Sequence, residues 1–460
     1  MNIQADGVPL PKRYWAILTV ALAISMAVLD GAIANIALPV IARDLHASPA
    51  ASIWVVNAYQ LAITVSLLAF SSLGDIYGYR RVYQTGLAVF TVTSVICALS
   101  DSLTTLTIAR ILQGFGAAGL MSVNAALIRV IYPKAQLGRG MALNSLIVAL
   151  SSAAGPTIAA AILAVASWQW LFAINLPLGV LAFVIAMKAL PNNAHKATHA
   201  FDFKSALLNA LTFGLLIFSI DGLGHEANRL LVLAMLAVAI VVGYFFVRRQ
   251  LTLSAPLLPI DLLRIPIFGL SICTSICSFC AQMLAMVSLP FYLQETLGRT
   301  ATQTGLLLTP WPLAIVFVAP LAGRLVEKKY SPGMLGGVGM AIFAAGLLLL
   351  ALLPADPSGL DIAWRMTLCG IGFGFFQSPN NFAMLSSAPA HRGGGASGML
   401  GTARLLGQTM GASLVALMFS LFPMNGTRNS LLAAALFAIC AAGVSCMRMA
   451  NGVTKKMAPG

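Results

Sequence analysis

Two ionisable side chains lie within long apolar runs of the chain, where a charge is costly. Asp30 is the only acid well inside a predicted membrane span, and Arg110 lies near the middle of another. Hydrocarbon does not solvate a charge, so each group should be paired, protonated or facing water. Because burial favours the neutral carboxyl, Asp30 could take up and release a proton as its access alternates between two solutions. Structural roles, a packing carboxyl and an anchor for the span of Arg110, are the alternatives.

Further polar and aromatic residues lie in runs that could line a central cavity. Arg404 is a second buried cation with no acid in the last six predicted spans, and it could hold an anionic group of a substrate. Aromatic faces suit lipophilic cations, although packing and interfacial anchoring explain most aromatic residues of membrane proteins. The candidate substrate contacts are Asn35, Asn57, Tyr59, Gln113, Gln282, Trp311, Phe376, Gln377, Asn380, Asn381 and Arg404.

Apolar helices are the elements that must position these residues. Of the 460 residues, 59% are hydrophobic and 9% are charged, whereas soluble domains carry about 25% charged residues. A spanning helix needs about 20 mainly apolar residues, and the chain contains fourteen such runs. They are predicted at 14–38, 52–73, 82–99, 103–128, 140–165, 168–187, 205–220, 230–247, 267–293, 302–322, 333–353, 364–387, 396–421 and 430–446. The predicted fold class is therefore an all-α polytopic membrane protein.

The positive charges test this map, because Lys and Arg collect on the cytoplasmic side of membrane proteins. Twenty of the 27 fall on the face that carries both termini and five on the other face, while Arg110 and Arg404 lie within spans. This split predicts a multi-pass protein of the cell inner membrane with both termini in the cytoplasm. The net charge of +14 is scattered along the chain, which argues against a nucleic-acid surface.

Two long polar stretches, 190–204 and 248–265, bracket the seventh and eighth spans. They divide the chain into a six-helix bundle at 1–188, two inserted helices with flanking loops at 189–265, and a second six-helix bundle with a short tail at 266–460.

The two groups of six look related. Gly114, Gly116 and Asn124 share their spacing with Gly370, Gly372 and Asn380. Internal duplication of this kind is typical of transporters that bind solute between their halves near the midplane.

Several segments resemble motifs of the major facilitator superfamily, specifically its fourteen-span drug:proton antiporter branch. Residues 29–39 are similar to its first-span motif, 73–81 to its loop between spans two and three, 110–116 to its fourth-span motif, and 168–177 to the sixth span of that branch. Gly155 and Pro156 resemble the centre of its antiporter motif. Ile76 and Tyr79 depart from the loop motif, and Ala142, Ser151, Ala159 and Ala160 replace glycines of the antiporter motif.

The resemblance implies a major facilitator fold of two pseudo-symmetric six-helix bundles plus two inserted helices, and it gives roles to particular residues. Asp30 and Arg110 would couple transport to protons. Asp75, Arg80 and Arg81 would form a gating loop, with Glu327 repeating it in the second half, although a solvated charged turn is the simpler interpretation. Gly155 and Pro156 would permit a bend, because proline removes one helix hydrogen bond.

The resemblance implies a secondary active transporter, a proton-coupled antiporter that exports lipophilic or cationic drugs or toxic compounds by alternating access. A proton-coupled transporter of a specific small metabolite on the same fold is the alternative, and a membrane enzyme or non-transporting receptor is a second class. The sequence has no phosphate loop, metal-binding His cluster or Ser/His/Asp set. We therefore expect no enzyme activity and no cofactor. The expected partners are a small-molecule substrate, protons and the lipid bilayer, with no nucleic acid, for a functional monomer.

Overall fold

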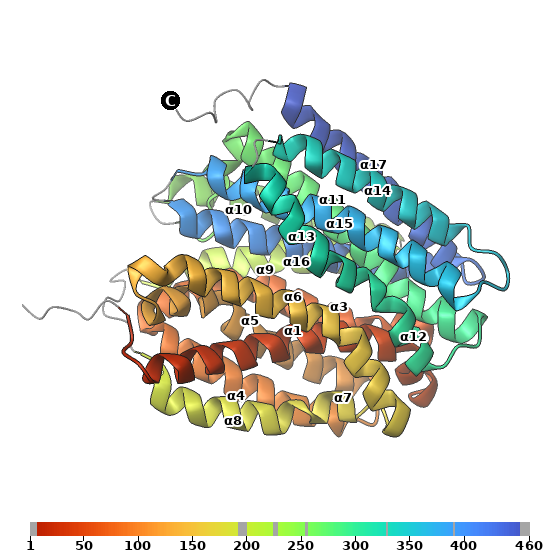
Figure 1. The fold of residues 1–460 in the computed structure, drawn as a ribbon, viewed down its shortest axis with the longest axis horizontal. Coiled ribbons are helices and arrows are strands. Elements are labelled where there is room, and N and C mark those ends of the chain that lie inside the picture. Colours follow the sequence, from red (N-terminus) through yellow and green to blue (C-terminus); the bar gives the residue numbers. More distant parts are fainter. Residues whose placement is uncertain are drawn as a thin grey trace, which may run out of the picture.

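Helices dominate the computed structural model, which describes residues 7–191, 200–223, 229–253, 256–327, 330–389 and 392–450 (Figure 1). No strand occurs in those ranges. Twelve of the helical segments are long and apolar enough to cross a membrane. The predicted all-α polytopic membrane class is therefore confirmed.

Residues 12–189 form the lower bundle in Figure 1, coloured red to yellow. Helices α3 and α4 both pack on α5, while α1 packs on α6 and α8. The helices of this bundle are α1 (Lys12–Asp44), α2 (Pro49–Ser52), α3 (Trp54–Tyr77), α4 (Tyr79–Ala98), α5 (Leu103–Ile131), α6 (Leu137–Val165), α7 (Trp170–Ala173) and α8 (Asn175–Ala189).

Residues 266–450 form the upper bundle in Figure 1, coloured green to blue. Helix α14 packs on α15 and α17, and α11 packs on α16 and α17. The helices of this bundle are α11 (Pro266–Phe291), α12 (Ala301–Leu308), α13 (Pro310–Glu327), α14 (Pro332–Ala351), α15 (Gly359–Ser387), α16 (Gly393–Leu421) and α17 (Gly426–Ala450), with a π-helical turn at Tyr292–Thr296. The single span predicted at 302–322 is two helices, because α13 begins at Pro310, which has no N–H to continue α12.

All fourteen predicted spans fall on helices, but two fall on helices outside the group of twelve. These are 82–99 on α4 and 364–387 on α15. Helix α4 carries Arg80, Arg81 and Gln84, and α15 carries Asp361 and Arg365, so both are more polar than their neighbours. The count of fourteen spans stays a prediction.

Helices α9 (Phe203–Gly222) and α10 (Arg229–Thr252) pack against each other, and α9 also contacts α3 and α16. The Nδ2 of Asn209 donates to the carbonyl oxygen of Val65 at 2.9 Å, and the Nε1 of Trp54 donates to Asp221 at 3.0 Å. This pair therefore lies against both bundles. The predicted boundaries at 188 and 265 remain predictions, and parts of the intervening loops, at 192–199, 224–228 and 254–255, lie outside the described residues.

Asp202 caps the start of α9 and ties it to α10. Its carboxylate accepts the backbone N–H of Ser205 at 3.1 Å and pairs with Arg249 at 2.9 Å. Burial tends to raise the pKa of this carboxyl, but the hydrogen bonds from Ser205 and Arg249 together outweigh it and lower the pKa.

The internal repeat predicted from glycine spacing appears in the packing of α5 and α15. A Cβ at Gly114 would lie 2.6 Å from the carbonyl oxygen of Tyr59, and a Cβ at Gly370 would overlap the carbonyl oxygen of Trp311. The glycine two residues later is equally close to a neighbouring backbone in both helices. Gly116 lies against Phe90, and Gly372 lies against Phe343. Equivalent glycines therefore let equivalent helices approach closely in the two bundles.

The repeat does not extend to the ionisable residues. Arg110 lies four residues before Gly114, whereas Met366 lies four residues before Gly370. Cys369 likewise takes the place of Gln113. The buried guanidinium and amide of α5 consequently have no counterparts on α15.

Two hydrogen bonds between the bundles lie toward the end of the molecule away from the start of α1. The Nε2 of Gln294 donates to the carbonyl oxygen of Ile36 at 3.0 Å, near the far end of α1. The hydroxyls of Thr157 and Thr309 lie 2.9 Å apart, and Thr157 is in the last third of α6. These bonds join α1 and α6 to the second bundle near the end opposite the first residues of α1, whereas α3 and α16 also meet at mid-length, where the hydroxyls of Thr64 and Thr409 lie 3.2 Å apart.

Candidate functional site

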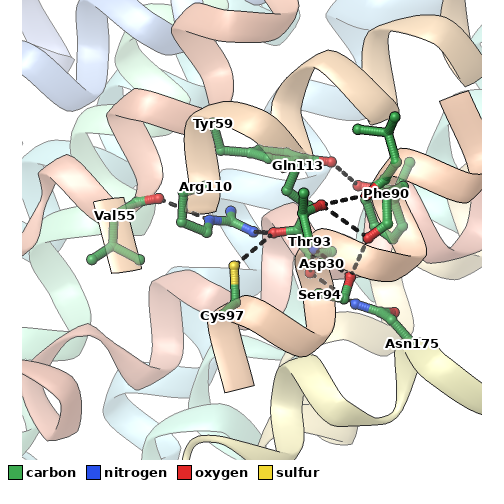
Figure 2. A network of polar contacts seen from close by, with 12 residues as sticks. Asp30, Val55, Tyr59, Phe90, Thr93, Ser94, Cys97, Arg110, Gln113 and Asn175 are labelled. Carbon is green, nitrogen blue, oxygen red and sulfur yellow. Dashed lines mark hydrogen bonds and ion pairs between the residues drawn. The ribbon is translucent and has the colours of Figure 1, made fainter. Parts of the chain in front are cut away.

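Asp30 lies buried within the first bundle, surrounded by donors from two other helices (Figure 2). Its carboxylate forms an ion pair with Arg110 of α5. It also accepts hydrogen bonds from the Nε2 of Gln113 at 2.9 Å and the Nδ2 of Asn175 of α8 at 3.0 Å. The two ionisable residues singled out from the sequence are therefore in direct contact.

Arg110 also makes hydrogen bonds and ring contacts that do not involve Asp30. Its Nε donates to the carbonyl oxygen of Val55 at 2.9 Å, and its Nη1 donates to the Oε1 of Gln113 at 2.6 Å. Its Cζ lies 4.1 Å from the centroid of the Tyr59 ring and 5.4 Å from that of Phe172. The Nη2 is buried without a hydrogen-bond partner in the described structure. The guanidinium therefore keeps a defined position even if the carboxylate becomes neutral.

Gln113 links the ion pair to α4. Its Nε2 donates to the hydroxyl of Ser94 at 2.8 Å as well as to Asp30, and the thiol of Cys97 lies 3.5 Å from its Oε1. Sequence reasoning did not single out Ser94 or Asn175 as site residues. Asn175 did carry a signal, since it is an amide within an apolar run, but nothing in the sequence joins it to Asp30.

A cavity of ≈ 130 Å³ lies between the two bundles. Five of the predicted substrate contacts line it, namely Asn35, Tyr59, Gln282, Trp311 and Arg404. Sequence reasoning missed other members, among them Gln60, Met121, Ser152, Met283, Met286 and Gln408. The lining residues come from α1, α3, α5, α6, α11, α12, α13 and α16, so the cavity is bounded by both halves.

Tyr59 separates the cavity from the ion pair. Its ring is in contact with Arg110, its hydroxyl donates to the carbonyl oxygen of Ala27 at 3.0 Å, and it also lines the cavity. Gly31, the residue after Asp30, lines the cavity as well, whereas Asp30 does not. The ionisable pair is therefore adjacent to the cavity but behind its wall.

The remaining predicted contacts lie elsewhere. Asn57 donates to the hydroxyl of Ser413 at 3.0 Å across the interface between the bundles. Phe376 packs against Phe373. None of Asn57, Gln113, Phe376, Gln377, Asn380 and Asn381 lines the cavity.

A second polar cluster forms around Arg448 at the end of the second bundle. Its guanidinium donates to Asn380 at 2.8 Å, to Ser271 at 3.0 Å and to Ser445 at 2.7 Å. The sequence places Arg448 beyond the last span at 430–446, whereas α17 continues to Ala450 and Arg448 is buried. Asn380 thus joins α15, α11 and α17, because a buried guanidinium needs acceptors.

The loop expected to act as a gate is a tight turn between α3 and α4. Gly78 forms the turn with a φ of 108°, a conformation that glycine adopts readily. The hydroxyl of Tyr79 donates to Asp75 at 2.7 Å, and Arg80 donates to the carbonyl oxygen of Met187 at the end of α8. Arg81 is exposed. In the second half, the side chain of Glu327 and the following Lys328 and Lys329 lie outside the described residues.

Gly155 and Pro156 lie where α6 meets α1 and α12. A Cβ at Gly155 would lie 2.6 Å from the Cβ of Ala32, and the carbonyl oxygen of Pro156 faces Gly305. Pro156 also lines the cavity. The motif therefore allows a close helix approach beside the cavity, as small residues do in membrane bundles.

Comparisons with known proteins agree with this architecture. The chain is 64% identical to an uncharacterized transporter, YebQ, of Escherichia coli, over 97% of this chain and 98% of that protein. It is 29% identical to the riboflavin transporter RibZ of Clostridioides difficile over 89% of each chain. It is 31% identical to the tetracenomycin C resistance and export protein of Streptomyces glaucescens, over 89% of this chain and 76% of that one.

Solved structures and a family model point the same way. The fold matches the crystal structure of a POT family transporter with a TM-score of 0.71 at 15% identity, covering 95% of this chain and 96% of that one. The model of the Major Facilitator Superfamily matches residues 20–412. Two helical bundles around a shared cavity, with this sequence match across most of the chain, make the protein a member of the Major Facilitator Superfamily of membrane transporters.

Proposed function

We propose that the protein is a proton-coupled antiporter of the inner membrane that exports lipophilic organic compounds by alternating access. Asp30 carries the proton and Arg110 is its partner. The observation that carries this proposal is a carboxylate only 3% exposed, held in an ion pair, and next in sequence to a residue that lines the cavity between the two bundles. An ionisable group at such a depth is typical of proton relays in transporters.

Protonation of Asp30 would remove its ion pair with Arg110 but leave the other contacts of Arg110 in place. A neutral carboxyl no longer pairs with Arg110 as an ion, but Arg110 retains the Val55 carbonyl, the Gln113 amide oxygen and the Tyr59 ring. The cluster can therefore exist in two arrangements that differ by one proton. A two-state element biased by a local charge is what coupling requires.

Helix α1 connects this cluster to the interface between the bundles. Asp30 lies on α1, and further along the same helix the carbonyl of Ile36 accepts the hydrogen bond from Gln294 of the second bundle. Helix α1 also contacts α11 and α12. A small shift of α1 on protonation would therefore act directly on contacts that hold the two bundles together.

The side on which the bundles join supports an inward-open arrangement. The hydrogen bonds that α1 and α6 make to the second bundle lie away from the start of α1, and the distribution of Lys and Arg favours a cytoplasmic location for both termini. The closed end would then face the outside. In this scheme Asp75, Arg80 and Arg81 form the opposing contacts of the outward-open state, so Asp75→Ala should change the accessibility of cysteines introduced at the two ends of the cavity. Unchanged labelling at both ends would contradict the gating role.

Export of lipophilic compounds is supported by the cavity and by relatives. Apolar and aromatic side chains make up much of its lining, and one relative is an export protein for tetracenomycin C. The cavity disfavours the cationic substrates expected from the sequence, because the described residues that line it include a guanidinium and no carboxylate. The riboflavin transporter among the relatives favours the second candidate, a proton-coupled transporter of one metabolite.

Transport in proteoliposomes tests the proposal. With an imposed pH gradient, the purified protein should move riboflavin, tetracenomycin C or a member of a panel of aromatic anions, cations and neutral compounds uphill, with protons moving in the opposite direction. Asp30→Asn should abolish uphill transport, whereas Asp101→Asn, at an exposed site between α4 and α5, should leave it unchanged. Undiminished coupled transport by Asp30→Asn would refute the proton-carrier role. Protons moving in the same direction as riboflavin would replace the antiporter with the metabolite symporter.

A further inference from the structure

Arg404 brings an unpaired positive charge to the cavity. It lies on α16 and lines the cavity. Its Cζ lies 5.5 Å from the centroid of the Phe279 ring, and it makes no hydrogen bond or ion pair to the residues that the structure describes. A guanidinium at this depth in a membrane protein is costly unless an anion or water compensates it. Among the described residues, the Arg404 guanidinium therefore has no anionic partner that would offset the cost of its burial.

The other charges near the cavity cancel. Asp30 and Arg110 pair with each other behind Tyr59. Among the described residues, those that line the cavity include neither Asp nor Glu. Arg404 is left as the charge that a molecule inside the cavity would meet, so the cavity has a net positive character.

Two amides accompany this guanidinium. Gln408 lies one helical turn after Arg404 and lines the same cavity, and Gln282 of α11 lines it as well. Both can donate N–H groups to an oxygen anion. Elsewhere the cavity is lined by Tyr59 and Trp311, which offer flat apolar faces. Three methionines, Met121, Met283 and Met286, add adaptable apolar surface.

We propose that Arg404, with Gln282 and Gln408, forms the anion-binding part of the substrate site, and that the transported molecule is an amphipathic organic anion. It would carry a carboxylate, sulfonate or phosphate group on a flat apolar body. A guanidinium binds such groups through two parallel hydrogen bonds, and the rings and methionines accept the body. The membrane potential also favours export of an anion from a negative cytoplasm. This inference rests on the proposed transport function and deepens it by naming the substrate class.

A set of probes that share one ring system and differ in charge tests the inference. Naphthalene-2-sulfonate, 2-naphthyltrimethylammonium and naphthalene-2-methanol are titrated against the purified protein in neutral detergent, with binding measured calorimetrically. The sulfonate should bind about tenfold more tightly than the cation and the alcohol, since one charge-assisted contact is worth about this factor. Equal affinities, a preference for the cation, or no binding of the sulfonate at millimolar concentration would overturn the inference.

Variants of Arg404 locate the site. Arg404→Gln should remove the preference for the sulfonate while leaving the affinity for the alcohol unchanged, and Arg404→Lys should retain part of the preference. The matched control is Arg428→Gln, which removes an exposed guanidinium at the start of α17 and should behave like the wild-type protein. If Arg404→Gln keeps the full preference, the anion does not bind at Arg404.

Two further comparisons, of binding with transport and of the sulfonate with a lipid, show which part of the proposal fails. Binding in detergent needs no proton movement, so absence of uphill transport with an intact sulfonate preference would refute the antiporter and leave the anion site standing. Intact uphill transport without that preference would refute the anion site alone. A lipid phosphate is the other source of such an anion. Added phosphatidylglycerol should leave the sulfonate affinity unchanged, and competition would assign the site to lipid and overturn the substrate assignment.

Discussion

The guanidinium of Arg110 lies over the ring of Tyr59, with 4.1 Å between its Cζ and the ring centroid. The other side of this tyrosine helps to line the cavity between the bundles. One side chain thus contacts both the charged cluster and the space where a substrate would bind. The ring of Tyr59 therefore lies between Arg110, the partner of Asp30, and that space.

Shortening Tyr59 should uncouple proton movement from transport. Tyr59→Ala opens the wall between the cavity and Arg110, so we expect proton leakage into proteoliposomes in the absence of substrate. Tyr59→Phe keeps the ring and loses only the hydrogen bond to the carbonyl oxygen of Ala27, which should lower the free energy of unfolding by about 1 kcal/mol. This variant should leak no more protons than the wild-type protein. A pH-sensitive dye trapped in the vesicles measures the leak. If proteoliposomes with Tyr59→Ala leak protons no faster than those with the wild-type protein, the Tyr59 ring is not the barrier to protons.

Removing the donor at Asn175 should destabilise the first bundle. Asn175→Ala takes one hydrogen bond away from the Asp30 carboxylate. A hydrogen bond to a charged group is worth about 1.5–3 kcal/mol, so the free energy of unfolding should fall by about that amount. Thermal unfolding in detergent measures the loss, and Asn425→Ala, at an exposed loop position, is the control that should keep the wild-type melting temperature. Equal melting temperatures for Asn175→Ala and the wild-type protein would show that this hydrogen bond does not hold α8 against α1.

The glycines of the repeat should be intolerant of a methyl group. A Cβ at Gly116 would lie 2.5 Å from the backbone nitrogen of Phe90, so Gly116→Ala forces α4 and α5 apart and should cost about 1–3 kcal/mol. Gly372→Ala should have a similar effect in the second bundle. Gly138→Ala meets nothing within 4 Å and should be neutral or slightly stabilising. Thermal unfolding in detergent compares the three, and equal melting temperatures for Gly116→Ala and Gly138→Ala would contradict the close approach.

The Asp202 cap predicts a loss of stability in acid. Because the pKa of Asp202 is lowered in the folded protein, its contribution is present at neutral pH and is lost as the pH falls through the folded pKa. The effect should be small, below about 1 kcal/mol, because the pair with Arg249 is partly exposed. Asp202→Asn should lower the melting temperature at pH 7 and flatten its decline between pH 5 and 3, relative to wild type. A parallel decline in both proteins would exclude this carboxylate as the cause.

The sequence alone was sufficient for the class of protein and for the burial of its key charges. Runs of apolar residues about as long as a bilayer is thick leave little alternative to membrane helices, so every predicted span falls on a helix. Asp30 and Arg110 were identifiable for the same reason, because a charge is conspicuous in an apolar run. Glycine spacing likewise indicated a repeat, since close helix packing requires small residues at fixed intervals.

The tertiary structure decided which polar groups meet. Asn175 is 145 residues from Asp30 in the chain, and Asn57 turned out to bridge the bundles and not to line the cavity. Periodicity within one helix says which residues share a face but not which helix that face meets. The polarity of the cavity was also decided at this level. The sequence predicts that Asp30, Arg110 and Arg404 are each buried. Only the tertiary structure shows that Asp30 and Arg110 neutralise each other, whereas Arg404 faces the cavity.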